Sequence, residues 1–199
     1  MADMEKTGKN LEGRGFRVHR FATGAEAADY LVQTLHGTSI GIGGSVTIDT
    51  LGVYDRLCGS NEVFWHWKSH APETRDRAGK AETYLCSSNG VSENGEIVNI
   101  DGFGNRVAGT IYGPQRVFLV IGRNKIVPDL TGAIDRARNI AAPLNARRLN
   151  RHTPCAVGEP RCHDCRSPEK ICGVMTVFFM PPTSIKEFHV ILVDEDLGY

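Results

Sequence analysis

The chain lacks a hydrophobic run long enough to cross a membrane. Its longest apolar run, Val174 to Met180, has the length of a strand, whereas a membrane-spanning helix needs about 18 apolar residues. The segment Met1 to Lys6 is charged and leads into a polar stretch, so it does not have the pattern of a secretory signal. These absences favour a cytoplasmic protein without a membrane segment.

The sequence also has no net charge, because 23 Lys and Arg residues balance 23 Asp and Glu residues. It therefore has neither the overall basic field of many nucleic-acid-binding proteins nor an acidic tail. No internal repeat or low-complexity linker divides it. With 199 residues, the chain is long enough for one well-buried domain. We expect a single domain over residues 1–199 that binds neither nucleic acid nor a membrane.

Several common cofactor and catalytic motifs are missing. The glycine-rich segment 40–47 has neither the Gly-Lys-Ser/Thr of a Walker loop nor a complete G-x-G-x-x-G. No flavin or nicotinamide motif is present. No Ser–His–Asp or Cys–His pairing indicates a nucleophile, and we assign no catalytic role to the scattered histidines His19, His36, His66, His70 and His189.

Strand and helix patterns alternate along most of the chain. Apolar or alternating segments predict strands at 16–21, 38–42, 63–67, 83–86, 117–121, 174–180 and 188–193. Helical spacing and capping signals predict helices at 25–35, 46–57, 72–82 and 130–149, with a bend at Pro143. Residues 96–100 and 106–110 are expected to pair across a tight turn. The alternation indicates an α/β fold: an open, mostly parallel sheet with helices on both faces.

A glycine-rich junction follows the predicted strand 38–42. Gly43 and Gly44 would let backbone N–H groups approach an anion, and the following helix would add its partial positive charge. Ser45 and Thr47 could cap this helix and also reach a phosphate or carboxylate oxygen. A tight turn that docks the helix on the sheet explains the same residues.

Ser87 to Arg106 is dense in Asn, Asp, Ser and Gly. Glu93, Asp101, Asn105 and Arg106 could gather near the carboxyl ends of the strands, where open α/β sheets bind ligands. Arg106 could clamp a carboxylate, and Asp101 or Glu93 could act as a base. A hairpin fastened by side-chain caps is the alternative.

Three further polar residues complete the predicted ligand site. Asn89 lies in the same Asn-rich segment, and Asn124 and Lys125 follow the apolar strand 117–121. Lys125 would point toward the same crevice, although a solvated turn would also explain it.

Four cysteines crowd the stretch 153–173. Cys155, Cys162, Cys165 and Cys172 have the spacing C-x6-C-x2-C-x6-C, and the residues between them are polar and rich in Pro and Gly. Such a loop cannot bury a core, so a bound metal would supply its order. The other two cysteines, Cys58 and Cys86, stand apart, and we expect each to be a small buried residue.

The spacing favours a [4Fe–4S] cluster held by the four thiolates. It resembles the iron–sulfur loop of the endonuclease-III-type DNA glycosylases, C-x6-C-x2-C-x5-C, although that resemblance is confined to the loop. Zinc is the alternative, with His163 as a replacement ligand, and two disulfides or four free thiols are the others. Nearby arginines could stabilise a negatively charged cluster, dock an acidic redox partner, or form a solvated face: Arg138, Arg147, Arg148, Arg151 and Arg161.

Long segments of the chain resemble the LUD-domain family, to which the lactate-utilisation proteins B and C belong. The segments that carry the resemblance are 43–47, 87–108, 121–130, 139–149, 153–155, 162–172 and 189–199. In particular, the chain is similar to a short, stand-alone branch that carries the four-cysteine loop. The resemblance implies the fold shared by ribose-5-phosphate isomerase, glucosamine-6-phosphate deaminase and CoA transferases.

The resemblance also implies a function. Members of the wider family take part in oxidising L-lactate to pyruvate, but this chain lacks the extra ferredoxin-like cysteine sets of the B protein. We therefore expect an accessory subunit that binds a small carboxylate or phosphorylated ligand, carries the cluster, and works with a redox protein partner or as a homo-oligomer. A non-catalytic ligand-binding or redox-sensing module, and an acyl-CoA or sugar-phosphate enzyme on the same fold, are the alternatives.

Overall fold

The computed structural model describes residues 3–199, so Met1 and Ala2 of the charged N-terminal segment lie outside the described residues. The strands are β1 (Arg17–Phe21), β2 (Ser39–Ile42), β3 (Glu62–Trp65), β4 (Thr83–Cys86), β5 (Gly90–Ser92), β6 (Ile97–Asp101), β7 (Arg116–Gly122), β8 (Ile126–Val127), β9 (Val174–Phe178) and β10 (Glu187–Val193). The helices are α1 (Met4–Gly13), α2 (Gly24–Thr34), α3 (Val46–Thr50), α4 (Tyr54–Cys58), α5 (Thr74–Lys80), α6 (Asn105–Ile111), α7 (Leu130–Arg136), α8 (Ala142–Arg148) and α9 (Pro154–Val157).

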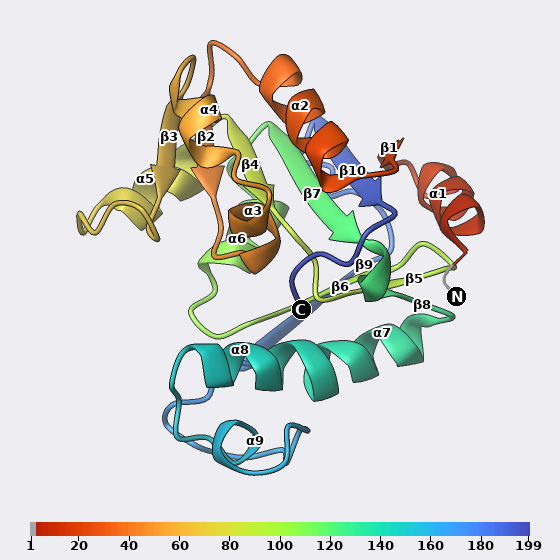
Figure 1. Cartoon of the computed structure of the whole chain (residues 1–199), viewed down its shortest axis with the longest axis vertical. Coiled ribbons are helices and arrows are strands. Elements are labelled where there is room, and N and C mark those ends of the chain that lie inside the picture. The colour runs from red at the N-terminus through yellow and green to blue at the C-terminus, as the bar shows by residue number, and fades with distance from the viewer. Residues whose placement is uncertain (1–2) are drawn as a thin grey trace.

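The main sheet confirms the predicted α/β class. Within residues 3–199 it has six strands in the order β1-β10-β7-β4-β2-β3 (Figure 1), and every pairing between neighbours is parallel. Its central strands are buried on both faces, which is why they are apolar throughout rather than alternating.

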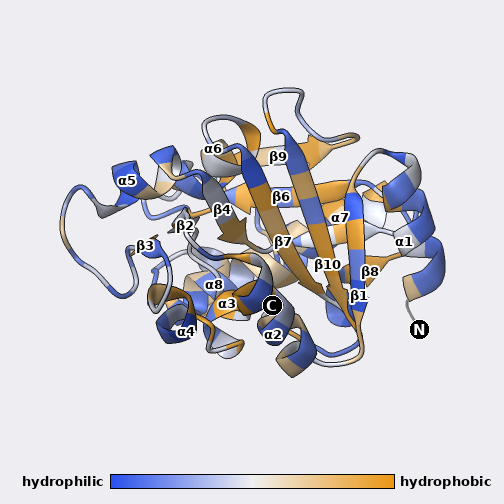
Figure 2. Ribbon diagram, turned by 90° about the horizontal axis from the view of Figure 1, so that it is seen from above, coloured by the Kyte–Doolittle hydropathy of each residue, from blue (hydrophilic) through white to orange (hydrophobic). Residues whose placement is uncertain are grey.

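Alternate residues of each central strand supply two different cores. On β10, Phe188, Val190 and Leu192 face one core, whereas Ile191 and Val193 face the other, because successive side chains of a strand point to opposite faces. One face is packed by α2, α3 and α4, and the other by α1, α5, α6 and a second sheet. The apolar strands therefore lie between polar outer helix surfaces (Figure 2).

The second sheet was not predicted. It has the order β8-β5-β6-β9 and mixes one parallel with two antiparallel pairings. Its outer face is covered by α7 and the helical residues that follow (Figure 1). The predicted strand at 106–110 is wrong: these residues form α6, and β6 pairs with β5 and β9 instead.

Two predicted helices are interrupted. The helix predicted at 46–57 is split into α3 and α4, because Gly52 adopts a left-handed φ of 63°. The helix predicted at 130–149 is present as α7, a π-helical turn and α8 in succession. Residues Ala137–Ala141 form a π-helical turn, and Pro143 lies in the first turn of α8, where its missing N–H costs little.

The strand order predicts a crevice at the carboxyl ends of the main-sheet strands. The chain leaves β2 toward β3 in one direction, whereas it leaves β4 toward β7 in the other. Loops that diverge in this way leave an opening outside the carboxyl ends of parallel strands. In the described part of the chain, no helix is both long enough and apolar enough to span a bilayer.

Candidate functional site

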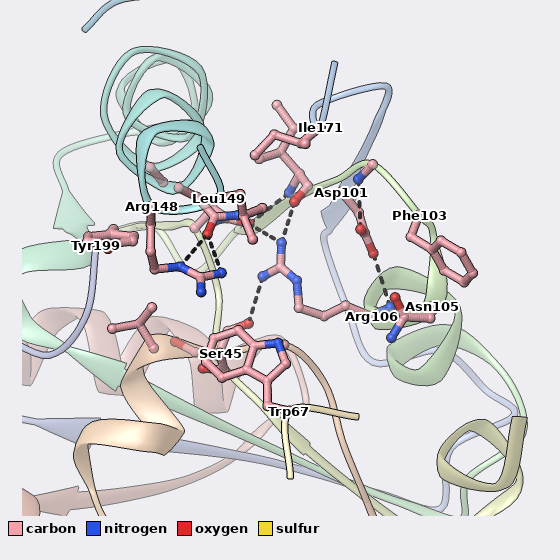
Figure 3. A pocket seen from close by; sticks show the side chains of 18 of the residues that line it. Ser45, Trp67, Asp101, Phe103, Asn105, Arg106, Arg148, Leu149, Ile171 and Tyr199 are labelled. Atoms are coloured by element: carbon pink, nitrogen blue, oxygen red, sulfur yellow. Dashed lines mark hydrogen bonds between the residues drawn. The ribbon is translucent and has the colours of Figure 1, made fainter. Parts of the chain in front are cut away.

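A cavity of about 930 Å³ opens at the carboxyl edge of the main sheet. The segments that follow β2, β3, β4 and β7 form one side of it, and residues from α6, α8 and the cysteine-rich loop form the other. Figure 3 shows Arg106 reaching from α6 into this space, between Ser45 and Trp67 on one side and Ile171 on the other. Strands, helices and the loop thus converge on one site.

The cavity lining is strongly cationic, although the whole chain is neutral. Seven Lys and Arg side chains line it, against three Asp and Glu side chains. The cations are Lys68, Arg75, Arg106, Lys125, Arg148, Arg151 and Lys170. Each of the three acids already has a partner. Asp49 forms an ion pair with Lys68, Glu169 pairs with His152, and Asp101 caps α6. The lining is therefore suited to an anion.

The guanidinium of Arg106 donates its hydrogen bonds to neutral oxygens. Its Nη2 donates to Asn89 Oδ1 at 2.7 Å and to the Ile100 carbonyl, and its Nη1 donates to Asn99 Oδ1 at 3.3 Å and to the Ser87 carbonyl at 3.4 Å. These contacts fix the guanidinium in place without neutralising its charge. The positive charge therefore remains available to attract a carboxylate or phosphate, and the Nε–H is the one donor not used in these contacts.

Lys125 lies deeper, only 3% exposed, yet among the residues that line the cavity. Its Nζ is 2.7 Å from Thr47 Oγ1, 2.8 Å from Ser87 Oγ and 3.2 Å from the Ser88 carbonyl oxygen. Burial, together with the nearby positive charges of Arg136 and Arg106, holds the pKa of Lys125 well below its ordinary value.

A third buried cation, Arg136, supports the site from α7. It donates to the backbone carbonyls of Asn124 at 2.8 Å and Asn89 at 2.5 Å, and to the main-chain oxygen of Tyr199 at 3.3 Å. Burial lowers its pKa to about 10. Among the described residues, no Asp or Glu side chain forms an ion pair with Arg106, Lys125 or Arg136.

Most of the predicted ligand residues meet at this cavity. Its lining includes Gly44, Ser45, Thr47, Asn89, Asp101, Asn105, Arg106 and Lys125. Gly43 lies just behind: a Cβ there would be 3.1 Å from Arg106 Cγ and 3.0 Å from the Tyr84 hydroxyl, so glycine permits the close approach. Asn124 instead tethers the C-terminal segment, bonding the Gly198 carbonyl at 3.2 Å and the Leu197 N–H at 3.1 Å.

The two candidate bases have other contacts. Asp101 Oδ2 accepts hydrogen bonds from the backbone N–H groups of Arg106 and Val107, at 3.0 and 3.1 Å, and so caps α6. The expectation that Glu93 joins the crevice is wrong. Glu93 follows β5, does not line the cavity, and pairs with Lys6 of α1 at 3.1 Å.

Sequence reasoning missed the residues after β3 and on α8. His66 and Trp67 line the cavity, and the Arg148 guanidinium lies 4.5 Å from the centre of the Trp67 ring. Burial and the nearby Arg75 lower the pKa of His66, which favours a neutral imidazole. Their position was foreseeable, because both directly follow a predicted parallel strand whose end faces the crevice.

The cysteine-rich loop lies against the cavity, since its residues 168–171 are part of the lining. All four of its cysteines are free thiols and partly buried. Cys162 is held from the π-helical turn: its Sγ accepts from Arg138 Nη2 at 3.3 Å, and its N–H donates to Asn139 Oδ1 at 2.8 Å. His163 is exposed and contacts the Glu159 carbonyl.

The four thiols do not form a coordination group. Across residues 3–199, no three His, Cys, Asp or Glu side chains lie close enough together to hold a metal ion. The thiols are nevertheless neighbours: burial raises the pKa of the Cys172 thiol, and the charges of Cys162, Cys165 and Cys155 raise it further. Four cysteine thiolates are suitable ligands for an iron–sulfur cluster or for zinc. To bind either, the four sulfur atoms would have to move closer together than they are in this structure. Of the other two, Cys86 is buried as predicted, whereas Cys58 is exposed.

The parallel sheet defines an α/β protein with a cation-lined cavity at the carboxyl ends of its strands. The chain belongs to the LUD-domain family, whose model matches residues 4–193.

A solved structure supports the fold. A DUF162 family protein from Deinococcus radiodurans superposes with a TM-score of 0.56, covering 96% of this chain and 95% of its own, at 13% sequence identity. At that identity the similarity is evidence for the fold alone. A search of curated proteins gives no significant match.

Proposed function

We propose that this protein binds a small carboxylate or phosphorylated ligand in the cavity at the carboxyl edge of the main sheet. The observation that carries the proposal is the cationic lining of the cavity, in which the Arg106 guanidinium forms no ion pair with an Asp or Glu side chain of the described residues. Burying uncompensated charge is costly, so a bound anion would stabilise the site. The buried hydroxyl of Ser88, which has no hydrogen-bond partner among the described residues, is available to the same ligand.

Within this proposal the protein is an accessory subunit in the oxidation of L-lactate or a related 2-hydroxy acid. Membership of the LUD-domain family supports a general relation to lactate utilisation. The site offers groups that bind and orient an anion. Such a role requires an electron-accepting partner, so gentle lysis should retain a flavin or iron–sulfur protein with this chain. Its absence would contradict the accessory role but not ligand binding.

We further propose that Cys155, Cys162, Cys165 and Cys172 hold a [4Fe–4S] cluster, with zinc as the alternative. A cluster would either order the loop or relay one electron. Anaerobically purified protein should contain iron and sulfide with a visible band that dithionite bleaches. Zinc without colour would contradict the cluster and leave a structural clip.

Replacing Arg106 tests the anion site. Arg106→Ala should weaken the binding of L-lactate, pyruvate or dihydroxyacetone phosphate by about 1.5–3 kcal/mol, roughly 10- to 150-fold, because the positive charge that attracts the anion is lost. Isothermal titration calorimetry measures the change. Arg56→Ala is the matched control, since Arg56 pairs with Asp29 at the surface, away from the cavity. Equal affinities in wild type and Arg106→Ala, or no binding by the wild type, would contradict the proposal.

A sensing role is the second candidate, favoured by the contact between loop and cavity. Because residues 168–171 line the cavity, metal loss that loosens the loop should also weaken ligand binding. The same titration on metal-stripped protein distinguishes the candidates: unchanged affinity would eliminate the sensor. The acyl-CoA or sugar-phosphate enzyme with Glu93 as its nucleophile has no support, because Glu93 lies outside the cavity.

A further inference from the structure

We propose that Lys125 is a nucleophilic amine that forms an imine with an anion carrying a ketone or aldehyde next to its charged group. This inference rests on the proposed function, because the anion must first bind in the cavity. It goes further by naming the reactive group of the ligand: a carbonyl carbon, as in a 2-oxo acid or a keto phosphate.

The first argument is where the amine lies. Lys125 follows β7 at the carboxyl edge of the sheet and is the most buried cation of the cavity lining. Its three contacts, Thr47 Oγ1, Ser87 Oγ and the Ser88 carbonyl, are neutral oxygens. A lysine kept as a structural cation is ordinarily paired with a carboxylate when buried. Here the near charges are arginines, and a lysine beside other cations in a dry site is a typical imine-forming residue.

The second argument is that the anchor and the amine contact the same residue, Ser87. Arg106 donates to the carbonyl of Ser87, and Lys125 donates to the hydroxyl of the same residue. One residue therefore links the guanidinium that would hold the anionic group to the amine that would attack. A ligand whose carbonyl carbon adjoins its carboxylate, or lies close to its phosphate, is short enough to meet both.

The covalent step is balanced without an oxidant or reductant. The neutral Nζ gives its lone pair to the carbonyl carbon, and the carbonyl π electrons move to oxygen, which receives a proton from the nitrogen. The resulting carbinolamine loses its hydroxyl with a second nitrogen proton as water, which leaves a C=N bond. The hydroxyls of Thr47 and Ser87, both in contact with Nζ, can pass these protons.

Reductive trapping tests the inference. The intact protein is incubated with pyruvate or with dihydroxyacetone phosphate and sodium cyanoborohydride, and peptide mapping locates the adduct. We expect one adduct per chain, on Lys125, lost in Lys125→Met and retained in Lys186→Met, which removes an exposed lysine outside the cavity. The probe that reacts identifies whether the anionic group is a carboxylate or a phosphate. Arg106→Ala should slow labelling by about 10-fold or more, because the anchor is lost.

A second variant covers the case in which Lys125→Met does not fold. Lys125→Arg keeps a buried donor but cannot form an imine, so it should bind the probe without being trapped. If the wild-type protein binds a probe in the titration but yields no adduct on Lys125, the inference is overturned and the proposed function stands. Adducts spread over surface lysines and unchanged by either variant would also overturn it. If neither probe binds, both the inference and the proposed function fail.

Discussion

At the residue scale, two groups of buried titratable side chains have different surroundings. Arg106 and Lys125 line the cavity and their side chains donate to neutral oxygens, which supports the proposed binding role. A second cluster lies between β1 and β10. There His189 stacks on Phe118 at 4.2 Å and its Nδ1 lies 3.0 Å from His19 Nε2, which indicates a structural role.

The His189 cluster predicts a pH dependence of stability. Burial lowers the pKa of His189 to about 4, although Glu187, 3.4 Å away, opposes the shift; His19 and Arg17 reinforce it. The unfolded chain, with a His pKa of about 6.5, binds the proton first. Stability is therefore complete above about pH 6.5 and falls by up to about 3 kcal/mol as the pH drops toward 4.

Urea unfolding at a series of pH values measures this loss. His189→Phe, which keeps a ring against Phe118, should flatten the profile between pH 4 and 6.5 to what the carboxylates alone produce. An identical slope in wild type and variant would show that His189 does not titrate on unfolding.

At the scale of elements, α6 depends on a close approach to β4. A Cβ on Gly109 would lie 2.5 Å from the Tyr84 ring, which is fully buried. Gly109→Ala should therefore destabilise the protein by about 1–3 kcal/mol through overpacking, although alanine is the better helix former.

Gly79 in α5 provides the matched control. A Cβ there meets nothing within 4 Å, so Gly79→Ala should stabilise the fold by about 0.5–1 kcal/mol. Thermal melts of the two variants measure both effects. The packing argument is contradicted if Gly109→Ala is as stable as Gly79→Ala.

Helix α6 and the elements around it show what could be predicted from sequence and what could not. The main strands were predicted because runs of apolar residues are a local signal. Helix α2 was predicted from its N-cap Thr23, which forms a capping box with Glu26 in the structure. The residues of α6 were mistaken for a strand because Val107, Ala108 and Thr110 suit either structure. What decides is Asp101, whose carboxylate caps the helix from the end of β6. The second sheet was missed because β6 and β9 pair across more than seventy residues of sequence.

The candidate site could be predicted from the sequence only in part. Residues that follow parallel strands, such as Ser45, Asn89 and Lys125, could be placed by topology alone. Glu93 was misplaced because β5 belongs to the second sheet, which carries it toward α1. Arg136 and Arg148 were missed because a helix approaches the cavity from the other side, a tertiary contact with no local signal.

At the scale of the whole molecule, a neutral chain concentrates positive charge in one place. Cations from α6, from α8 and from the turn after β7, together with the cysteine-rich loop, line the cavity at the carboxyl ends of the parallel strands. The proposed anion site therefore lies beside the thiol-rich loop within one fold. Binding of a small anion at this site is the central proposal for the molecule.

The most direct test is a crystal structure of the protein grown with pyruvate or dihydroxyacetone phosphate. The account predicts ordered density for the anion beside the Arg106 guanidinium, with its carbonyl carbon toward Lys125 Nζ. Density for the ligand elsewhere on the surface, or a cavity that holds only water at concentrations where titration shows binding, would contradict it.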